Sequence, residues 1–348
     1  MSDQLLTLQS LLEQANFKVY AFDMGRSVVS LAPTFWTEFE HGNAAWPAPV
    51  LRYAHFALLG VDPSKEHSIA WFFKLPLDER AHLNLGARDQ LIETIIQRAS
   101  DNAEALKKGE PADLRSAGAE LIQSIVPTTE KQARFHALAR KALQLPPTEH
   151  FNRAIELIDN YSSDNWAELP LQGLAELATR HEEQGNTQRL ATLVEKLDIE
   201  PLIHLSALID GEPIRPLLAK QLQRRIERHL HSDTNNTQPL HIAQALSHAG
   251  ENLSLEAARA IINSSQGVSA DGISVISGRF WKALQHPELA LQFLENIVLL
   301  DQGRSFPSAV QQLLYLTEIR PFVLAALNDP NRSDALADAV NTLLQRSV

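Results

Sequence analysis

Apolar residues follow two different spacing patterns along the chain. In the first 75 residues, short apolar runs alternate with turns. After Pro76, leucines and alanines recur at helical spacing, in segments about three turns long that proline, glycine or short polar breaks separate. The pattern predicts a mostly α-helical protein with a small α/β (α+β) head. We expect the head over residues 1–85 and an all-α domain over residues 86–348.

The head is predicted to contain a three-stranded sheet. Its expected elements are a leucine-rich helix capped by Ser2, strands over residues 17–22, 27–31 and 67–74, and a short helix over residues 34–40. The first two strands form a hairpin, and its turn contains Gly25, which can take a positive φ. Val50 to Leu59 is ambiguous. We favour a helix there, because its length and its alanines outweigh its single β-branched residue, Val50.

The later helices have no fixed period and no repeated signature. They are expected over residues 86–100, 112–126, 128–144, 148–160, 164–184, 187–197, 200–209, 213–231, 239–249, 254–264, 271–285, 287–299, 306–327 and 331–346. Prolines such as Pro239, Pro287 and Pro307 stand where first helical positions are expected. Short helices that cannot bury an apolar face alone must stack on neighbours, which predicts an irregular HEAT- or armadillo-like array. A compact helical bundle is the alternative.

Composition narrows the class of protein. The 31 Lys and Arg residues against 42 Asp and Glu residues give a formal charge of −11, which argues mildly against broad nucleic-acid binding. The chain has no cysteine, so disulfides, cysteine-ligated metals and cysteine nucleophiles are excluded. The first residues lack the basic and apolar regions of a secretory signal, and no apolar run approaches the ~18 residues of a membrane span. We therefore expect a cytoplasmic protein without membrane contact.

A first candidate surface lies at the hairpin tip and the end of the third strand. If those strands pair, six charged residues could approach one rim and bind a partner or an anion: Asp23, Arg26, Lys74, Asp78, Glu79 and Arg80. In the alternative interpretation, Asp78 or Glu79 starts the next helix and the basic groups pair in solvent. No nucleophile and base stand together here.

Some of the same segments resemble a known family signature. Phe22-Asp23-Met24-Gly25-Arg26, Phe35 to Glu40, Pro47-Ala48-Pro49 and Trp71-Phe72-Phe73-Lys74-Leu75-Pro76-Leu77-Asp78-Glu79 resemble the signature of an uncharacterised gammaproteobacterial family of about this length, described only as a domain of unknown function. The resemblance implies no activity. It implies that the hairpin and the segment from Lys74 to Glu79 are shared features.

A second candidate surface is a basic ridge on the helix expected at 213–231. Lys220, Arg224 and Arg228 follow at four-residue spacing and His231 extends the row, opposite an apolar side formed by Ile214, Leu218, Leu222, Ile226 and Leu230. A further basic segment contains Lys131, Arg134, His136, Arg140 and Lys141. Together the two could line one surface that holds an acidic partner or a nucleic-acid backbone. A solvated helix face is the alternative.

Familiar catalytic motifs are missing from the sequence. His181-Glu182-Glu183 is not followed by a second histidine at zinc-protease spacing, and Ile273 stands where the loop from Gly267 to Gly272 would need a nucleotide-binding lysine. We therefore predict no cofactor, no metal and no catalytic residues.

Three functions are compatible with these patterns. The favoured one is a non-catalytic interaction or scaffold protein that binds another macromolecule, most simply a protein, through its helical surface and the N-terminal rim. The alternative is an enzyme with an acid–base or anion-binding site in the head. The third is a nucleic-acid-associated protein. It is disfavoured because no aromatic residue lies between Ala167 and Arg279 to stack on bases.

Overall fold

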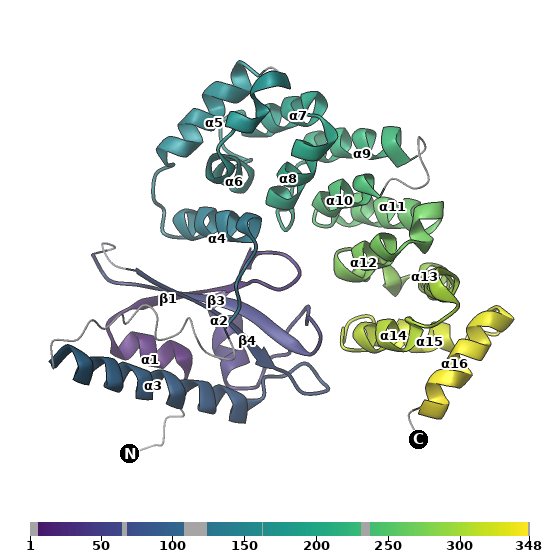
Figure 1. Ribbon diagram of the computed structural model, residues 1–348, viewed down its shortest axis with the longest axis horizontal. Helices are drawn as coiled ribbons and strands as arrows, with labels where there is room; N and C mark the ends of the chain where they lie inside the picture. The colour runs from purple at the N-terminus through teal and green to yellow at the C-terminus, as the bar shows by residue number, and fades with distance from the viewer. Residues whose placement is uncertain (1–5, 65–67, 108–123, 162, 231–236, 347–348) are drawn as a thin grey trace. The chain divides into compact units, whose positions relative to one another are not determined.

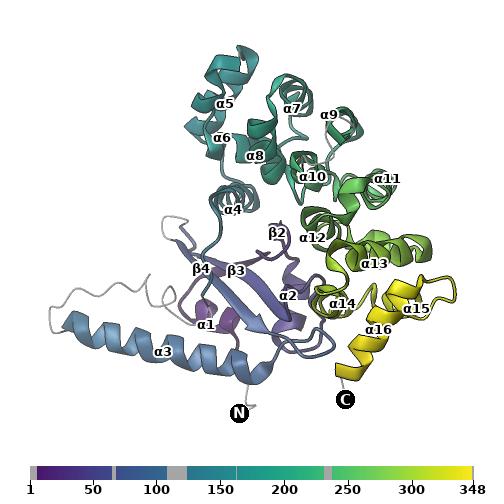
Figure 2. The ribbon, with the colours of Figure 1, turned by 45° about the vertical axis from the view of Figure 1, so that its right-hand side comes forward.

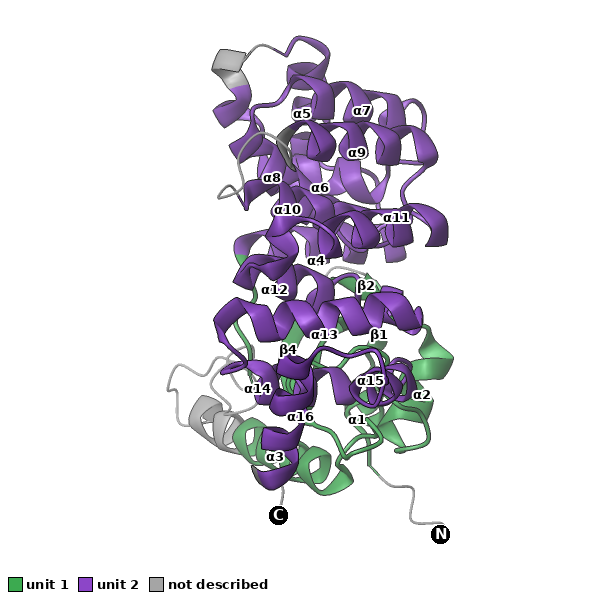
Figure 3. Ribbon diagram, turned by 90° about the vertical axis from the view of Figure 1, so that its right-hand side faces the viewer, with its two compact units in different colours: residues 1–128 green, residues 129–348 purple. Residues whose placement is uncertain are grey.

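The structure is a computed structural model that describes residues 6–64, 68–107, 124–161, 163–230 and 237–346. These residues are mostly helical, and they include one small antiparallel sheet. The chain forms two compact units, Met1–Thr128 and Thr129–Val348 (Figure 3). The division therefore falls after Thr128, whereas the sequence predicted a boundary at residue 85.

The sheet of unit 1 has four strands instead of the predicted three. They are β1 (Lys18–Asp23), β2 (Val29–Ser30), β3 (Tyr53–Val61) and β4 (Ser68–Pro76), in the order β2-β1-β3-β4 with every neighbour antiparallel. Gly25 in the β1–β2 turn does not take a positive φ. Glycine is favoured here because a larger residue would be crowded: a Cβ would lie 3.0 Å from Oδ1 of Asp23 and 3.2 Å from Val50.

The helix predicted over Val50 to Leu59 is wrong, because most of this segment is β3. The successive residues Phe56 and Ala57 point to opposite faces of the sheet and both are fully buried. A strand buried on both faces shows a continuous apolar run instead of an alternating one, so its sequence lacks the two-residue period. Pairing with β1 and β4 outweighs the helix preference of its alanines.

Three helices of unit 1 bury their apolar sides in one core with the sheet (Figure 1). They are α1 (Leu8–Gln14), α2 (Pro33–Glu40) and α3 (Leu85–Lys107). The core contains Leu12 of α1, Phe39 of α2, Ile92 of α3 and Phe56 and Phe73 of the strands. Register puts both phenylalanines on one face of the sheet. The helix predicted at 34–40 is confirmed by α2.

Two predicted details of unit 1 fall partly outside the described residues. Thr7, whose side chain accepts a hydrogen bond from the Ser10 amide, caps α1, while the expected cap Ser2 is not described. Most of the helix predicted over 112–126 is not described either. Its last residues are not helical, since Ser124 forms an isolated β-bridge with Phe73 and the amide of Ile125 donates to the carbonyl of Phe72 at 3.0 Å.

Unit 2 consists of successive short helices. They are α4 (Thr129–Ala142), α5 (Glu149–Asp159), α6 (Leu171–Thr179), α7 (Asn186–Lys196), α8 (Ile199–Ile209), α9 (Pro216–Leu230), α10 (Gln238–Ala243), α11 (Glu251–Ile262), α12 (Ala270–Gly278), α13 (Pro287–Asp301), α14 (Phe306–Leu314), α15 (Arg320–Leu327) and α16 (Asp334–Arg346). The segments predicted as single helices over 164–184, 271–285 and 306–327 are each broken in two, with 3₁₀ turns at Ser163–Glu168 and Trp281–Gln285 in the first two.

Alternate helices of unit 2 pack on one another. One row runs α4, α6, α8, α10 and α12, and a second contains α5, α7 and α9, followed by α11 and α13. Figure 2 shows both rows within unit 2. Helices α5 and α6 approach so closely at Gly173 that a Cβ there would lie 2.1 Å from the carbonyl oxygen of His150. Most of these helices bury one side between neighbours and leave another side exposed, whereas α6 has no exposed residue.

Candidate functional site

The residues of the predicted rim do not share one face of the sheet. Asp23 pairs with Phe56, and Phe56 pairs with Phe73, so Lys74 points to the opposite face from Asp23. Asp23 is buried, and its Oδ1 accepts a hydrogen bond from the Gly25 amide at 2.6 Å. Lys74 lies over the ring of Tyr53, with Nζ 5.7 Å from its centroid. The strand β3, which the sequence did not predict, separates the two.

The other rim residues have local structural contacts. The Arg26 guanidinium donates to the carbonyl of Pro49 from Nε at 3.2 Å and from Nη2 at 2.9 Å. Asp78 organises the turn after β4, because its Oδ1 accepts from the amides of Arg80 and His82, each at 2.8 Å. Asp78, Glu79 and Arg80 are all exposed. The contacts of Asp78 are those of a turn-forming aspartate.

Replacing Asp78 with alanine is expected to cost about 1 kcal/mol of stability, because two backbone amides lose their acceptor. The Asp78→Asn variant keeps an acceptor oxygen at the same position and should stay within about 0.5 kcal/mol of the wild type. Urea denaturation of the three proteins measures the difference. Equal losses in both variants would mean that the carboxylate charge, and not the turn, is what matters.

The predicted basic ridge lies on the exposed side of α9. Lys220, Arg224 and Arg228 are exposed, while Leu218 and Leu222 on the other side are buried. Among the described residues none forms an ion pair or a side-chain hydrogen bond with any of the three basic side chains. We call these three residues the α9 row. The fourth predicted member, His231, lies outside the described residues.

The basic segment of α4 does not continue the α9 row. Its cations bind backbone carbonyls instead: Arg134 Nη1 donates to Leu208 at 2.7 Å, Arg140 Nη2 to Pro146 at 2.6 Å and Lys141 Nζ to Thr179 at 2.5 Å. Leu208 and Thr179 lie in the last turns of α8 and α6, where carbonyls lack helical partners and the helix dipole favours positive charge.

Arg134 is also the centre of a buried ion pair. Its Nη2 lies 3.0 Å from Oε1 of Glu212, and the side chains are 2% and 7% exposed. Burial raises the pKa of Glu212 and lowers that of Arg134, and each charge opposes the shift of the other. Such a pair anchors α4 to the segment after α8, and it cannot contact an external phosphate.

A pocket of about 430 Å³ lies at the start of α9. It is lined by His181, Glu182, Gly185, Thr187, Gln188, Arg215, Pro216 and Leu217, which come from the α6–α7 loop, the start of α7 and the α8–α9 junction. The sequence does not predict this pocket, because the pattern at His181 and Glu182 bears only on zinc binding. The available signal was Leu217, an apolar residue on the polar side of the predicted helix.

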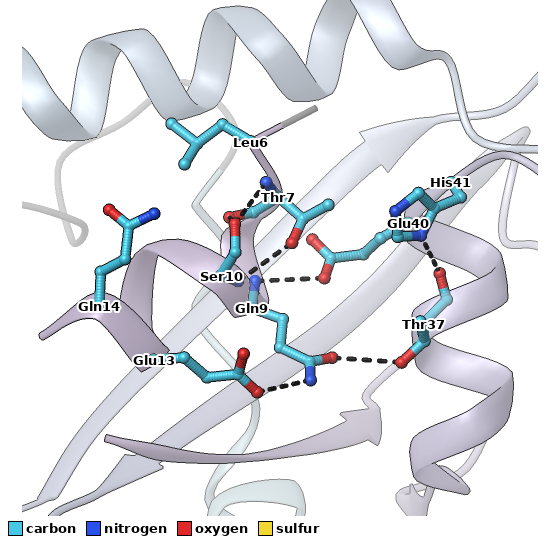
Figure 4. A pocket seen from close by; sticks show the side chains of 9 residues that line it. All are labelled: Leu6, Thr7, Gln9, Ser10, Glu13, Gln14, Thr37, Glu40 and His41. Carbon is cyan, nitrogen blue, oxygen red and sulfur yellow. Dashed lines mark hydrogen bonds between the residues drawn. The ribbon is translucent and has the colours of Figure 1, made fainter. Parts of the chain in front are cut away.

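A second pocket, of about 490 Å³, lies between α1 and α2 in unit 1 (Figure 4). Glu40 is its most deeply buried residue, 1% exposed. The Glu40 carboxylate accepts hydrogen bonds from the amides of Leu8 at 2.7 Å and Gln9 at 3.1 Å, the first two residues of α1. Glu40 therefore holds the N-terminal end of α1 against the C-terminal end of α2.

Burial raises the pKa of Glu40 to about 7. The two amide hydrogen bonds and the charge of the fully buried Arg88 oppose this shift without cancelling it. Arg88 itself donates to the backbone carbonyl of Glu40 and to the carboxylate of Asp89. The arrangement supplies a carboxyl that titrates near neutrality, but its contacts are those of a helix cap.

Neither pocket has the ligand set of a metal centre. No three histidine or acidic side chains come together to hold an ion in the part of the chain that the structure describes. Among the described helices, none has both the length and the apolar composition that crossing a membrane requires.

Comparison with known proteins identifies one family. The model of the family described as "Protein of unknown function (DUF3549)" matches residues 3–344. The chain belongs to the DUF3549 family. No curated protein and no solved structure matches it. The DUF3549 match includes both compact units and therefore the α9 row, the pocket beside it and the Glu40 pocket.

Proposed function

We propose that this DUF3549 protein is a non-catalytic cytoplasmic interaction protein whose unit 2 is an irregular HEAT- or armadillo-like scaffold for a partner protein. The packing of alternate helices supports such a scaffold, because stacked helices such as α5, α7 and α9 keep an exposed side along the stack. The exposed turn from Asp78 to Arg80 is proposed as a second contact region, and the gammaproteobacterial origin of the family stays a prediction.

The observation that carries the proposal is the α9 row. Three cations stand exposed at four-residue spacing on a chain whose formal charge is −11, and no described acidic residue pairs with them. Elsewhere in unit 2, some exposed arginines do have acidic partners, such as Arg259 with Glu288 at 2.9 Å and Arg153 with Glu156 at 3.5 Å. A row without acidic partners among the described residues favours an acidic binding partner.

An enzymatic function has less support. In the predicted rim Asp78 organises a turn, and in the α1–α2 pocket Glu40 caps a helix, so each candidate acid has a structural task. A single basic surface formed by α4 and α9 would have supported a nucleic-acid function. Arg134 is buried in its ion pair instead, which leaves the α9 row as a short, isolated strip of charge.

Affinity capture with charge variants tests the proposal. The tagged wild type should retain a stoichiometric protein partner after nuclease treatment, and the Arg224→Gln/Arg228→Gln double variant should lose most of it. The control is Arg153→Gln/Arg259→Gln, which removes the same charge from exposed arginines of α5 and α11.

Two results would contradict the proposal. If the captured material disappears on nuclease treatment, the nucleic-acid alternative is favoured. If both double variants retain the partner equally, the α9 row does not bind it.

A further inference from the structure

The pocket at the start of α9 suits an uncharged group. Its two charged side chains, Glu182 and Arg215, face each other with Oε1 and Nε 3.8 Å apart and offset each other. Burial lowers the pKa of His181, which favours a neutral imidazole at physiological pH. His181 is 2% exposed, and its Nδ1 has no hydrogen-bond partner in the part of the chain that the structure describes. The pocket thus has almost no net charge, although the neighbouring helix side is strongly basic.

Leu217 joins this pocket to the α9 row. It is 45% exposed, lines the pocket and precedes Lys220 by three residues and Arg224 by seven. Residues at these separations share one side of a helix, so Leu217 lies on the same side of α9 as the α9 row and before its first residue. This side of α9 therefore begins with the apolar side chain of Leu217, beside the uncharged pocket, and continues with the three cations of the α9 row.

The spacing of the cations sets the spacing of their ligands. Four residues of helix rise about 6 Å, so successive charges of the row stand about 6 Å apart along α9. In an extended peptide, side chains on one face repeat every two residues, or about 6.6 Å. An extended segment with an acidic residue at every second position can therefore place one carboxylate near each cation, where charge complementarity favours the contact.

We propose that the pocket beside Leu217 anchors one apolar side chain of an acidic peptide segment in the partner protein, while alternate carboxylates of the same segment lie along Lys220, Arg224 and Arg228. The inference rests on the proposed interaction function and adds the chemistry of the partner. A nucleic-acid backbone would match the row but has no apolar group for the pocket. Aromatic residues that could stack on its bases are absent from the sequence between Ala167 and Arg279.

Fluorescence anisotropy with synthetic peptides tests whether an acidic peptide with one apolar side chain binds to the pocket and the α9 row. The probe is a labelled peptide in which one leucine is followed by alternating glutamate and serine. A second peptide has the leucine at the other end, and in a third serine replaces the leucine. The leucine peptide of the correct direction should bind the full-length protein about tenfold more tightly than the serine peptide, as expected for burial of one apolar side chain.

Variants of the protein locate the contact. Leu217→Ser should weaken binding of the leucine peptide about tenfold and leave binding of the serine peptide unchanged. Only the leucine peptide has an apolar side chain that contacts Leu217. Leu217 is exposed, so its replacement leaves the buried side of α9 intact. Arg224→Gln/Arg228→Gln should weaken all peptides, and Arg153→Gln/Arg259→Gln should weaken none.

Three outcomes would overturn the inference. If Leu217→Ser weakens both peptides equally or neither, the pocket does not bind the leucine. If single-stranded DNA of the same charge binds more tightly than the peptides and depends on Arg224 and Arg228, the row binds nucleic acid. If no peptide binds while affinity capture still yields a partner that depends on the row, the proposed function stands and this ligand chemistry is wrong.

Discussion

Replacing Glu212 with alanine is expected to destabilise the protein by about 3–5 kcal/mol, the largest effect of any single charge removal considered. The variant leaves the Arg134 guanidinium buried, 2% exposed, without its carboxylate partner. The hydrogen bond from Arg134 to the carbonyl of Leu208 does not balance the charge. Asp210, whose charge also stabilises the Arg134 guanidinium, already pairs with Arg279 at 2.7 Å. Urea denaturation followed by helical circular dichroism measures the loss.

A matched pair at the surface provides the control. Arg259 and Glu288 lie 2.9 Å apart, nearly the distance of Arg134 and Glu212, but their side chains are 46% and 57% exposed. Glu288→Ala should cost no more than about 1 kcal/mol, because water solvates the arginine that remains. The double variant Arg134→Met/Glu212→Leu should recover most of the lost stability, since it leaves no unpaired buried charge. Equal losses for Glu212→Ala and Glu288→Ala would refute this explanation.

The second large effect is a fall in stability as pH rises through the titration of Glu40. The pKa of Glu40 is raised from 4.5 to about 7 in the folded protein. Between these values the folded state holds a proton that the unfolded state has released, so stability decreases as pH increases. A shift of this size corresponds to about 3 kcal/mol, lost progressively between about pH 4.5 and pH 7.

The Glu40→Gln variant isolates this contribution, because glutamine resembles the protonated carboxyl at every pH. Unfolding free energies at pH 5, 6, 7 and 8 should show the variant gaining on the wild type as pH rises, with a plateau above pH 7. The control Glu38→Gln changes an exposed glutamate of the same helix and should leave the wild-type slope unchanged. Parallel curves for Glu40→Gln and the wild type would show that Glu40 does not titrate in this window.

The helical part of the fold was largely readable from the sequence. Regular apolar spacing located most helices of unit 2, and Pro239, Pro287 and Pro307 do occupy first or second helical positions. The exceptions have a common physical cause. Long apolar stretches such as 306–327 do not reveal where a helix breaks, because both halves bury one side in the same way. β3 was missed for a related reason, since burial on both faces removes its alternation.

The candidate sites were only partly readable. The α9 row follows from periodicity on a single helix, so Lys220, Arg224 and Arg228 were found. The role of Arg134 depends on which carbonyls a neighbouring helix presents, and spacing within α4 does not contain that information. The pocket beside Leu217 combines residues about 30 positions apart, 181–188 and 215–217, so only the packing of α6, α7 and α9 brings them together.

The arginines that join the helices of unit 2 have a consequence for acid tolerance. Arg180 donates to the carbonyl of Leu145, and Arg225 to the carbonyls of Val194, Glu195 and Leu197. A guanidinium keeps its proton across the physiological range, and an amide carbonyl does not titrate there. These hydrogen bonds between helices therefore do not depend on a change of protonation, so the part of the support of α9 that Arg225 provides should be the same in acidic and alkaline buffers.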